Sequence, residues 1–130
     1  MKTLLVVEDD PIIMNLIVIL LEREGHKVLQ ASTAEEGITL AAGQTPDLIL
    51  MDVALPGMDG LEATRILKSR EDTRRIPVVA LTAQAMKQDT ERAERAGCDG
   101  FIAKPVSTRA FLSEVARFLG EDARAGEGRE

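Results

Sequence analysis

Tryptophan and tyrosine are absent from the sequence, and three phenylalanines are its only aromatic residues. Proteins that bind flavins or single-stranded nucleic acid stack these ligands on aromatic side chains, so the composition disfavours both classes. The net charge of −6 also argues against nucleic-acid binding, which requires a basic surface. Cys98 is the single cysteine, so no disulfide can form within the chain, and we expect a reducing compartment.

Long hydrophobic runs are also missing. The most apolar stretch, residues 12–21, has nine apolar residues in ten. Ten residues of helix span about 15 Å, which is half the hydrocarbon core of a bilayer. Residues 8–10, which precede this stretch, are all acidic, whereas a signal peptide begins with positive charge. We therefore expect a cytoplasmic protein that neither crosses nor binds a membrane.

The 130 residues fit one domain, and their pattern predicts a parallel sheet covered by helices. Short runs of β-branched residues and leucine alternate with segments of helical periodicity, as in repeated β-α-β units. Three of the runs are apolar at every position, which is typical of strands with helices on both faces. The predicted strands are 3–7, 27–31, 48–51, 78–81 and 101–103, and the predicted helices are 11–24, 34–42, 60–69, 85–96 and 108–119.

The last residues of the chain differ in composition from the rest. Residues 120–130 contain six charged residues and three glycines, so we expect a disordered charged tail after a domain of residues 1–119. Met1 directly precedes the first predicted strand and the tail is short. Both features favour a free-standing protein, and the alternative is a domain cut from a longer chain.

Side chains that suit a cation and a phosphoryl group follow the predicted strands. The carboxyl ends of parallel strands meet at one edge of a doubly wound sheet, where functional groups gather. The residues that follow strands in this way are Glu8, Asp9, Asp10, Asp52, Thr82, Lys104 and Pro105. If three of these four carboxylates pack ~5 Å apart, they repel one another by about 3 kcal/mol per pair at an effective dielectric constant of about 20. This edge of the sheet therefore needs a cation.

The predicted ligands of that cation are all oxygen atoms. They point to Mg²⁺ before Ca²⁺, because few carboxylates leave coordination positions for water. Zinc is disfavoured because Cys98 and His26 are single and lie elsewhere in the sequence. Beside Mg²⁺, the hydroxyl of Thr82 and the ammonium of Lys104 suit the oxygens of a phosphoryl group, which one carboxylate attacks in line.

Four segments with matching spacing carry a family resemblance. They are VEDD at residues 7–10, LILMDVALPGMDG at 48–60, IPVVALTA at 76–83 and GFIAKP at 100–105. The chain resembles the receiver domains of two-component response regulators over residues 2–119, and among them the small single-domain regulators of the DivK-like and CheY-like kind. The resemblance implies a three-layer (βα)5, flavodoxin-like or CheY-like fold. Its five-stranded parallel sheet would have the order 2-1-3-4-5, with helices on both faces.

The resemblance also implies a phosphoryl acceptor and a metal site. Asp52 would take a phosphoryl group from a phosphohistidine on a sensor histidine kinase or a histidine phosphotransfer protein. Asp10 and Asp52 would bind Mg²⁺ directly, Asp9 mostly through water, and the backbone carbonyl of Ala54 would complete the protein ligands. Mn²⁺ could replace Mg²⁺. The residue two positions past the acceptor, Ala54, and Gln84 would tune the rates.

The remaining implied residues belong to a switch. Thr82 and Lys104 would hold the phosphoryl oxygens, and a cis peptide bond before Pro105 would place Lys104. On phosphorylation Thr82 would move toward the new oxygens, and Phe101 would swing into the space that Thr82 leaves. The surface of the fourth helix, fifth strand and fifth helix would then change and bind a downstream protein.

Other functions fit the residues less well. Phosphatases that use an aspartate nucleophile and Mg²⁺ carry a second aspartate two residues later, where this chain has Ala54. We therefore expect no enzyme, only catalysis of its own phosphorylation and autodephosphorylation. A flavodoxin-like electron carrier would need a hydroxyl-rich loop after the first strand, where Asp9 and Asp10 stand. A receiver domain within a hybrid kinase or a longer regulator remains the third alternative.

The first predicted helix has more apolar residues than a core needs. On a helical wheel, Val18 and Ile19 fall on the outward side, near polar residues. Scattered apolar side chains on a surface are ordinary. The functional alternative, implied by the resemblance, is that this side docks on the helical bundle that bears the donor histidine.

Overall fold

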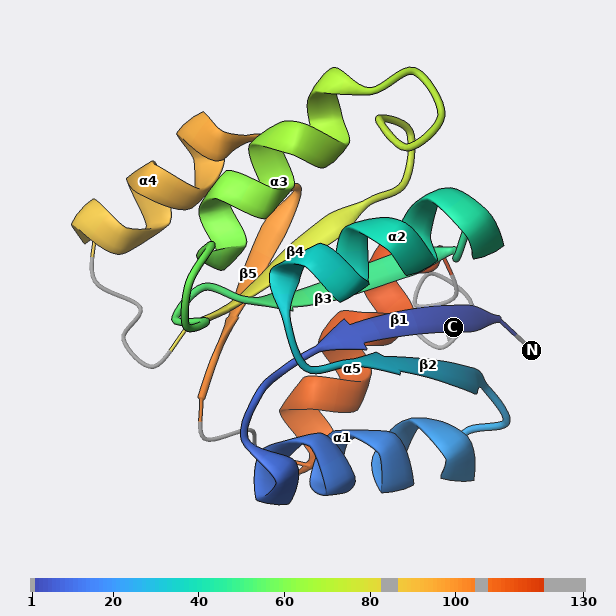
Figure 1. Ribbon diagram of the computed structural model, residues 1–130. Helices are drawn as coiled ribbons and strands as arrows, with labels where there is room; N and C mark the ends of the chain where they lie inside the picture. The colour runs from blue at the N-terminus through green and yellow to red at the C-terminus, as the bar shows by residue number, and fades with distance from the viewer. Residues whose placement is uncertain (1, 83–86, 105–107, 121–130) are drawn as a thin grey trace.

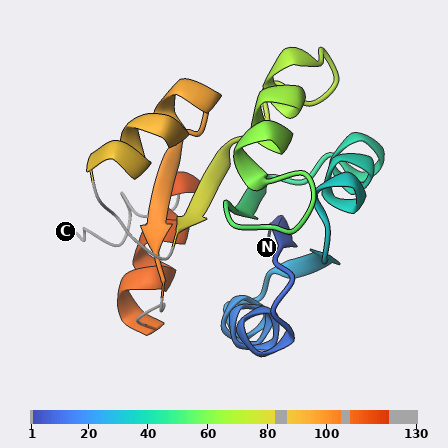
Figure 2. The same cartoon turned by 60° about the vertical axis from the view of Figure 1, so that its left-hand side comes forward.

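The computed structural model describes residues 2–82, 87–104 and 108–120. These residues form three layers, with a five-stranded sheet between two layers of helices (Figure 1, Figure 2). The strands are β1 (Thr3–Val7), β2 (Lys27–Ala31), β3 (Leu48–Asp52), β4 (Val78–Thr82) and β5 (Gly100–Ala103). The helices are α1 (Pro11–Arg23), α2 (Ala34–Gln44), α3 (Gly60–Ser69), α4 (Lys87–Ala96) and α5 (Thr108–Phe118).

The sheet has the order β2-β1-β3-β4-β5, and every pair of neighbouring strands is parallel. This confirms the predicted α/β fold and its strand order. In Figure 1, α1 and α5 cover one face of the sheet, whereas α2, α3 and α4 cover the other. β3 and β4 each run one residue further than predicted, so Asp52 and Thr82 are the last residues of the strands themselves.

The hydrophobic core is divided by the sheet, because side chains of a strand alternate between its two faces. In β1, Leu4 and Val6 pack in the cluster beneath α1 and α5. Leu5 and Val7 pack in the cluster beneath α2 and α3. All four side chains are fully buried. An all-apolar strand buried on both faces is what the sequence pattern predicted.

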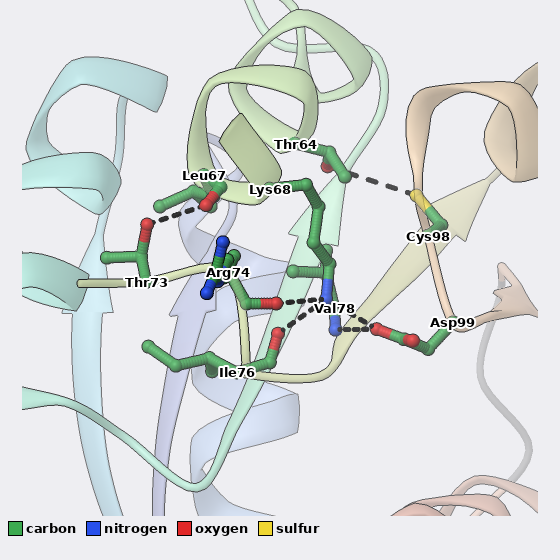
Figure 3. A network of polar contacts seen from close by, with 9 residues as sticks. All are labelled: Thr64, Leu67, Lys68, Thr73, Arg74, Ile76, Val78, Cys98 and Asp99. Atoms are coloured by element: carbon green, nitrogen blue, oxygen red, sulfur yellow. Dashed lines mark hydrogen bonds and ion pairs between the residues drawn. The ribbon is translucent and has the colours of Figure 1, made fainter. Parts of the chain in front are cut away.

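A polar network fixes the edge of the sheet where β4 and β5 begin (Figure 3). The ammonium of Lys68, in the last turn of α3, donates to the carbonyls of Ile76 at 2.8 Å and Arg74 at 3.3 Å, and to Asp99 Oδ2 at 3.0 Å. Asp99 Oδ2 also accepts the N–H of Val78 at 2.8 Å. One lysine therefore holds α3, the segment before β4 and the start of β5 together.

Two further sequence predictions concern the C-terminal tail and membrane spans. Residues 121–130 of the predicted tail lie outside the described residues. Within the part of the chain that the structure describes, none of the helices has the length and hydrophobicity that a membrane span needs.

Candidate functional site

Three carboxylates meet at the edge of the sheet where the parallel strands end. β1 and β3 are neighbours, with Val7 beside Met51, so the residues that follow these two positions also lie close together. Glu8, Asp9 and Asp52 each offer a carboxylate oxygen, and these oxygens all lie within 4.8 Å of one another. Glu8 and Asp52 are each only 2% exposed, whereas Asp9 faces solvent. A partly open, oxygen-only cluster of this kind suits a hard divalent cation.

Asp10, expected among the metal ligands, has another position. It is the N-cap of α1, and its Oδ1 accepts the N–H groups of Ile12 at 2.9 Å and Ile13 at 3.4 Å. Pro11 occupies the first helical turn, where its missing N–H costs nothing. The cap thus occupies one oxygen of the carboxylate that was expected to bind the metal, and the structure brings Glu8 into the acidic group instead.

Lys104 reaches the carboxylates from the end of β5. Its Nζ lies 3.0 Å from Glu8 Oε1 and 3.4 Å from Asp52 Oδ1, and its side chain is 14% exposed. The expected meeting of Lys104 with Asp52 is thus present. The sequence did not predict the contact between Lys104 and Glu8. A signal for it was present, because the Asp-Pro pair of residues 10–11 marks the start of a helix. Residues 8–9 are then the acids that lie at the end of the strand.

Burial and charge act against each other in this ion pair. Burial raises the pKa of Glu8, and the hydrogen bond from the Asp10 N–H and the ion pair with Lys104 offset only part of that rise. Burial also lowers the pKa of Lys104, but the hydrogen bond to Glu8 and the charge of Asp52 outweigh it, so the pKa of Lys104 is raised. Lys104 therefore remains a cation at neutral pH.

The main chain after β3 also holds Asp52. The N–H of Ala54 donates to Asp52 Oδ1 at 3.0 Å. This hydrogen bond fixes the orientation of that oxygen. Ala54, two residues past the predicted acceptor, is exposed, and its role in tuning rates stays a prediction.

Thr82 and Phe101 lie on the side of the site toward α4. Thr82 is 7% exposed at the end of β4, and its carbonyl accepts the N–H of Lys104 at 2.7 Å. Phe101 is 39% exposed on β5. Together with Ala54 and Ala93, both residues line a cavity of about 190 Å³. Two further expected residues, Gln84 and Pro105, lie outside the described residues.

Comparison with known proteins identifies the family. A sequence model described as the response regulator receiver domain matches residues 4–116. The chain belongs to this family. It is 42% identical over 120 residues to the polar-differentiation response regulator DivK of Brucella ovis, an alignment that covers 92% of this chain and 98% of that protein. The family expected from the sequence is confirmed.

Solved structures of similar proteins agree with this assignment. A putative response regulator from Chloroflexus aurantiacus has a TM-score of 0.87 and 28% identity, with 92% of this chain and 98% of that chain covered. The receiver domain of a sensor histidine kinase from Pseudomonas aeruginosa has a TM-score of 0.85 and 34% identity, with the same coverage. That structure has a magnesium ion coordinated in the active site cleft.

Membership in the family settles the general function. The chain is a phosphoacceptor domain of two-component signalling, and such domains are switches and not enzymes that turn over a substrate. They bind Mg²⁺ at an acidic site, and the cluster of Glu8, Asp9 and Asp52 fits that role. They act together with histidine kinases or histidine phosphotransfer proteins and with downstream targets.

Proposed function

We propose that Asp52 is the residue that accepts the phosphoryl group, from a phosphohistidine of a sensor histidine kinase or a phosphotransfer protein in the cytoplasm. The observation that supports this most is the position of its carboxylate, which has oxygens of Glu8 and Asp9 within 4.8 Å and the ammonium of Lys104 at 3.4 Å. The N–H of Ala54 orients one oxygen of Asp52, and the other oxygen is then the nucleophile.

In the proposed reaction, this oxygen of Asp52 attacks phosphorus in line with the leaving imidazole. The P–N bond of the phosphohistidine breaks as the new P–O bond forms. The imidazole leaves with the bonding electron pair and takes up a proton, and Asp52 becomes an acyl phosphate. Lys104 pairs with the negative oxygens of the transferred group, and the hydroxyl of Thr82 donates a hydrogen bond to it.

The residues that would hold Mg²⁺, or Mn²⁺ in its place, are Asp9, Asp52 and the carbonyl of Ala54. The site fits a divalent cation because three carboxylates share one ammonium and keep an uncompensated negative charge. Glu8 is less available, since Lys104 and the N–H of Asp10 occupy its two oxygens. When bound, the cation neutralises charge on the phosphoryl oxygens.

Phosphorylation is proposed to change the surface of α4, β5 and α5. Thr82 and Phe101 line one cavity, so a shift of Thr82 toward the phosphoryl group gives the ring of Phe101 room to turn inward. Phe101 also borders a groove of about 400 Å³ between α4, β5 and α5, together with Phe118. A downstream protein would bind there. Autodephosphorylation, tuned by Ala54 and Gln84, would reset the switch.

Incubation with acetyl phosphate and Mg²⁺, followed by mass spectrometry, tests the proposal. We expect the mass of one phosphoryl group to be added to the unchanged protein, and none to Asp52→Asn or in the presence of EDTA. Asp10→Asn is the matched control, because asparagine caps a helix as well as aspartate does. It should be phosphorylated normally. Phosphorylation of Asp52→Asn would disprove the assignment of Asp52.

A further inference from the structure

The first residue of α3, Gly60, lies directly against the main chain of Asp52. A Cβ atom built on Gly60 would lie 2.1 Å from the carbonyl oxygen of Asp52, 2.8 Å from its carbonyl carbon and 2.9 Å from Cγ of Met51. The carbonyl belongs to the end of β3 and cannot turn aside as the tip of a side chain can. Any side chain at Gly60 would therefore push α3 and Asp52 apart.

Backbone conformation does not explain this glycine. Among the described residues, the glycines with positive φ are Gly25, Gly57, Gly97 and Gly120. Gly60 is not among them, so its φ and ψ suit other residues. Glycine also disfavours a helix compared with alanine. The remaining explanation for glycine at this position is its close approach to Asp52, which leaves no room for a Cβ atom.

The other tightly packed glycines differ from Gly60 in what they touch. A Cβ on Gly37 would meet the side chain of Val7 at 2.7 Å, and one on Gly100 would meet the ring of Phe118 at 2.1 Å. Among the glycines that the structure describes, Gly60 is the one whose nearest atoms are main-chain atoms, and those atoms belong to the proposed acceptor.

The first turn of α3 also closes the loop that carries Ala54. The N–H of Gly60 donates to the carbonyl of Val53 at 3.3 Å, and the buried hydroxyl of Thr64 donates to the carbonyl of Gly60 at 2.8 Å. Ala54 lies within this loop and donates its N–H to Asp52 Oδ1. The start of α3 thus fixes both the acceptor and the group that orients it.

We propose that Gly60 is a positioning residue for phosphoryl transfer, because its contact with the Asp52 carbonyl sets where the acceptor carboxylate and the Ala54 main chain lie. The inference rests on the proposed role of Asp52. Gly60 itself touches neither the phosphoryl group nor the metal. Its effect is on the geometry of the residues that do, and small errors in such geometry slow a reaction strongly.

Gly60→Ala tests the inference, with Gly100→Ala as the matched control. The control introduces an equally short contact, but against Phe118 at the other edge of the sheet. We expect Gly60→Ala to weaken Mg²⁺ binding, measured by calorimetry, and to slow phosphorylation by acetyl phosphate, each by about tenfold or more. The NMR signal of the Ala54 amide should also shift. Gly100→Ala should keep all three values near those of the unchanged protein.

A second pair of variants decides the question if Gly60→Ala does not fold. Asp59 is the N-cap of α3 and accepts the N–H of Glu62 at 2.8 Å. Asp59→Asn removes its charge and keeps the cap, whereas Asp59→Ala removes both. If the start of α3 positions Asp52, Asp59→Ala binds Mg²⁺ more weakly and is phosphorylated more slowly than Asp59→Asn. Equal values for these two variants would overturn the inference.

The outcomes separate this inference from the proposed function. A folded Gly60→Ala with an unchanged Mg²⁺ affinity, phosphorylation rate and Ala54 amide signal would overturn the positioning role and leave Asp52 as the acceptor. Absence of phosphorylation in the unchanged protein would overturn the proposed function instead. The Ala54 signal and the Mg²⁺ affinity would then still decide whether Gly60 fixes Asp52.

Discussion

Glu8 and Lys104 are 96 positions apart in the chain and form an ion pair with 3.0 Å between Oε1 and Nζ. Two strands, β3 and β4, separate the strands that precede these residues. Lys104 therefore reaches across the end of β3, and on the way its Nζ lies 3.4 Å from Asp52 Oδ1. The pair joins opposite parts of the sheet over Asp52, the proposed acceptor, and fixes the ammonium of Lys104 beside it.

Replacement of Lys104 by methionine should destabilise the metal-free protein. The change leaves Glu8 and Asp52, both almost fully buried, without their ammonium, and removal of one partner from a buried pair costs about 3 kcal/mol. We expect the free energy of unfolding to fall by about this amount in EDTA, and part of the loss to return with Mg²⁺. Lys27→Met, at an exposed lysine of β2, is the control. Urea unfolding followed by circular dichroism measures the free energy of unfolding of both variants. Equal losses in Lys104→Met and Lys27→Met would contradict a stabilising role of the ion pair between Glu8 and Lys104.

Asp52→Asn should raise the melting temperature in the absence of Mg²⁺. The acidic group holds three carboxylates against one ammonium, so loss of one charge relieves repulsion. A gain of about 1 kcal/mol corresponds to about 3–5 °C for a domain of this size. Mg²⁺ should raise the melting temperature of the unchanged protein and have less effect on the variant.

Asp10→Asn is the control for this experiment. The carboxylate of Asp10 caps α1 and lies outside the acidic group. The Asp10→Asn variant should therefore have the same melting temperature as the unchanged protein, with and without Mg²⁺. A constant melting temperature in Asp52→Asn, and no response of the unchanged protein to Mg²⁺, would show that the carboxylates do not repel one another.

Much of the fold and of this site followed from the pattern of residues. Apolar runs alternating with helical segments predicted the parallel sheet, and the rule that strand ends share an edge placed Asp52 and Lys104 together. The structure places Asp10 at the cap of α1 and outside the acidic group, and this difference from the expected metal ligand has a physical reason. A helix cap and a metal compete for the same carboxylate, and sequence spacing does not show which contact forms. The hydrogen bond from the Glu8 N–H to the carbonyl of Ala31 at 3.0 Å continues the sheet pairing past Val7 and carries Glu8 into the site.

The outward side of α1 was also predicted only in part. Ile19 is 54% exposed, as expected. Val18 is half-buried, because it packs against the core cluster that includes Phe111 and Val115 of α5. A helical wheel describes one helix alone and does not contain the neighbour that covers it. The position of α5 beside α1 comes from the tertiary fold.

Lys68→Met should reveal how much the polar network where β4 and β5 begin contributes to the stability of the protein. The ammonium of Lys68 binds two carbonyls and Asp99, and its side chain is 21% exposed. Loss of these charged hydrogen bonds should lower the free energy of unfolding by about 2 kcal/mol. The nearby pair of Arg70 and Asp72 is 42% and 51% exposed, so Arg70→Met should cost less than about 1 kcal/mol. A larger loss in Arg70→Met than in Lys68→Met would refute the stabilising role of the Lys68 network.

The apolar stripe of α1 should matter for transfer from a protein donor and not from a small molecule. Ile12, Leu16 and Ile19 are 79%, 42% and 54% exposed, and their spacing places them along one side of the helix. The stripe begins just after the acidic residues, where a helical bundle that presents its phosphohistidine to Asp52 would lie.

We expect Leu16→Asp to slow phosphorylation by the histidine donor about tenfold, a cost of about 1.4 kcal/mol, and to leave the reaction with acetyl phosphate unchanged. Thr39→Asp, at an exposed position of α2 on the other face of the sheet, is the control and should slow neither reaction. If Leu16→Asp slowed both reactions equally, the stripe would act on the site itself and not on the donor.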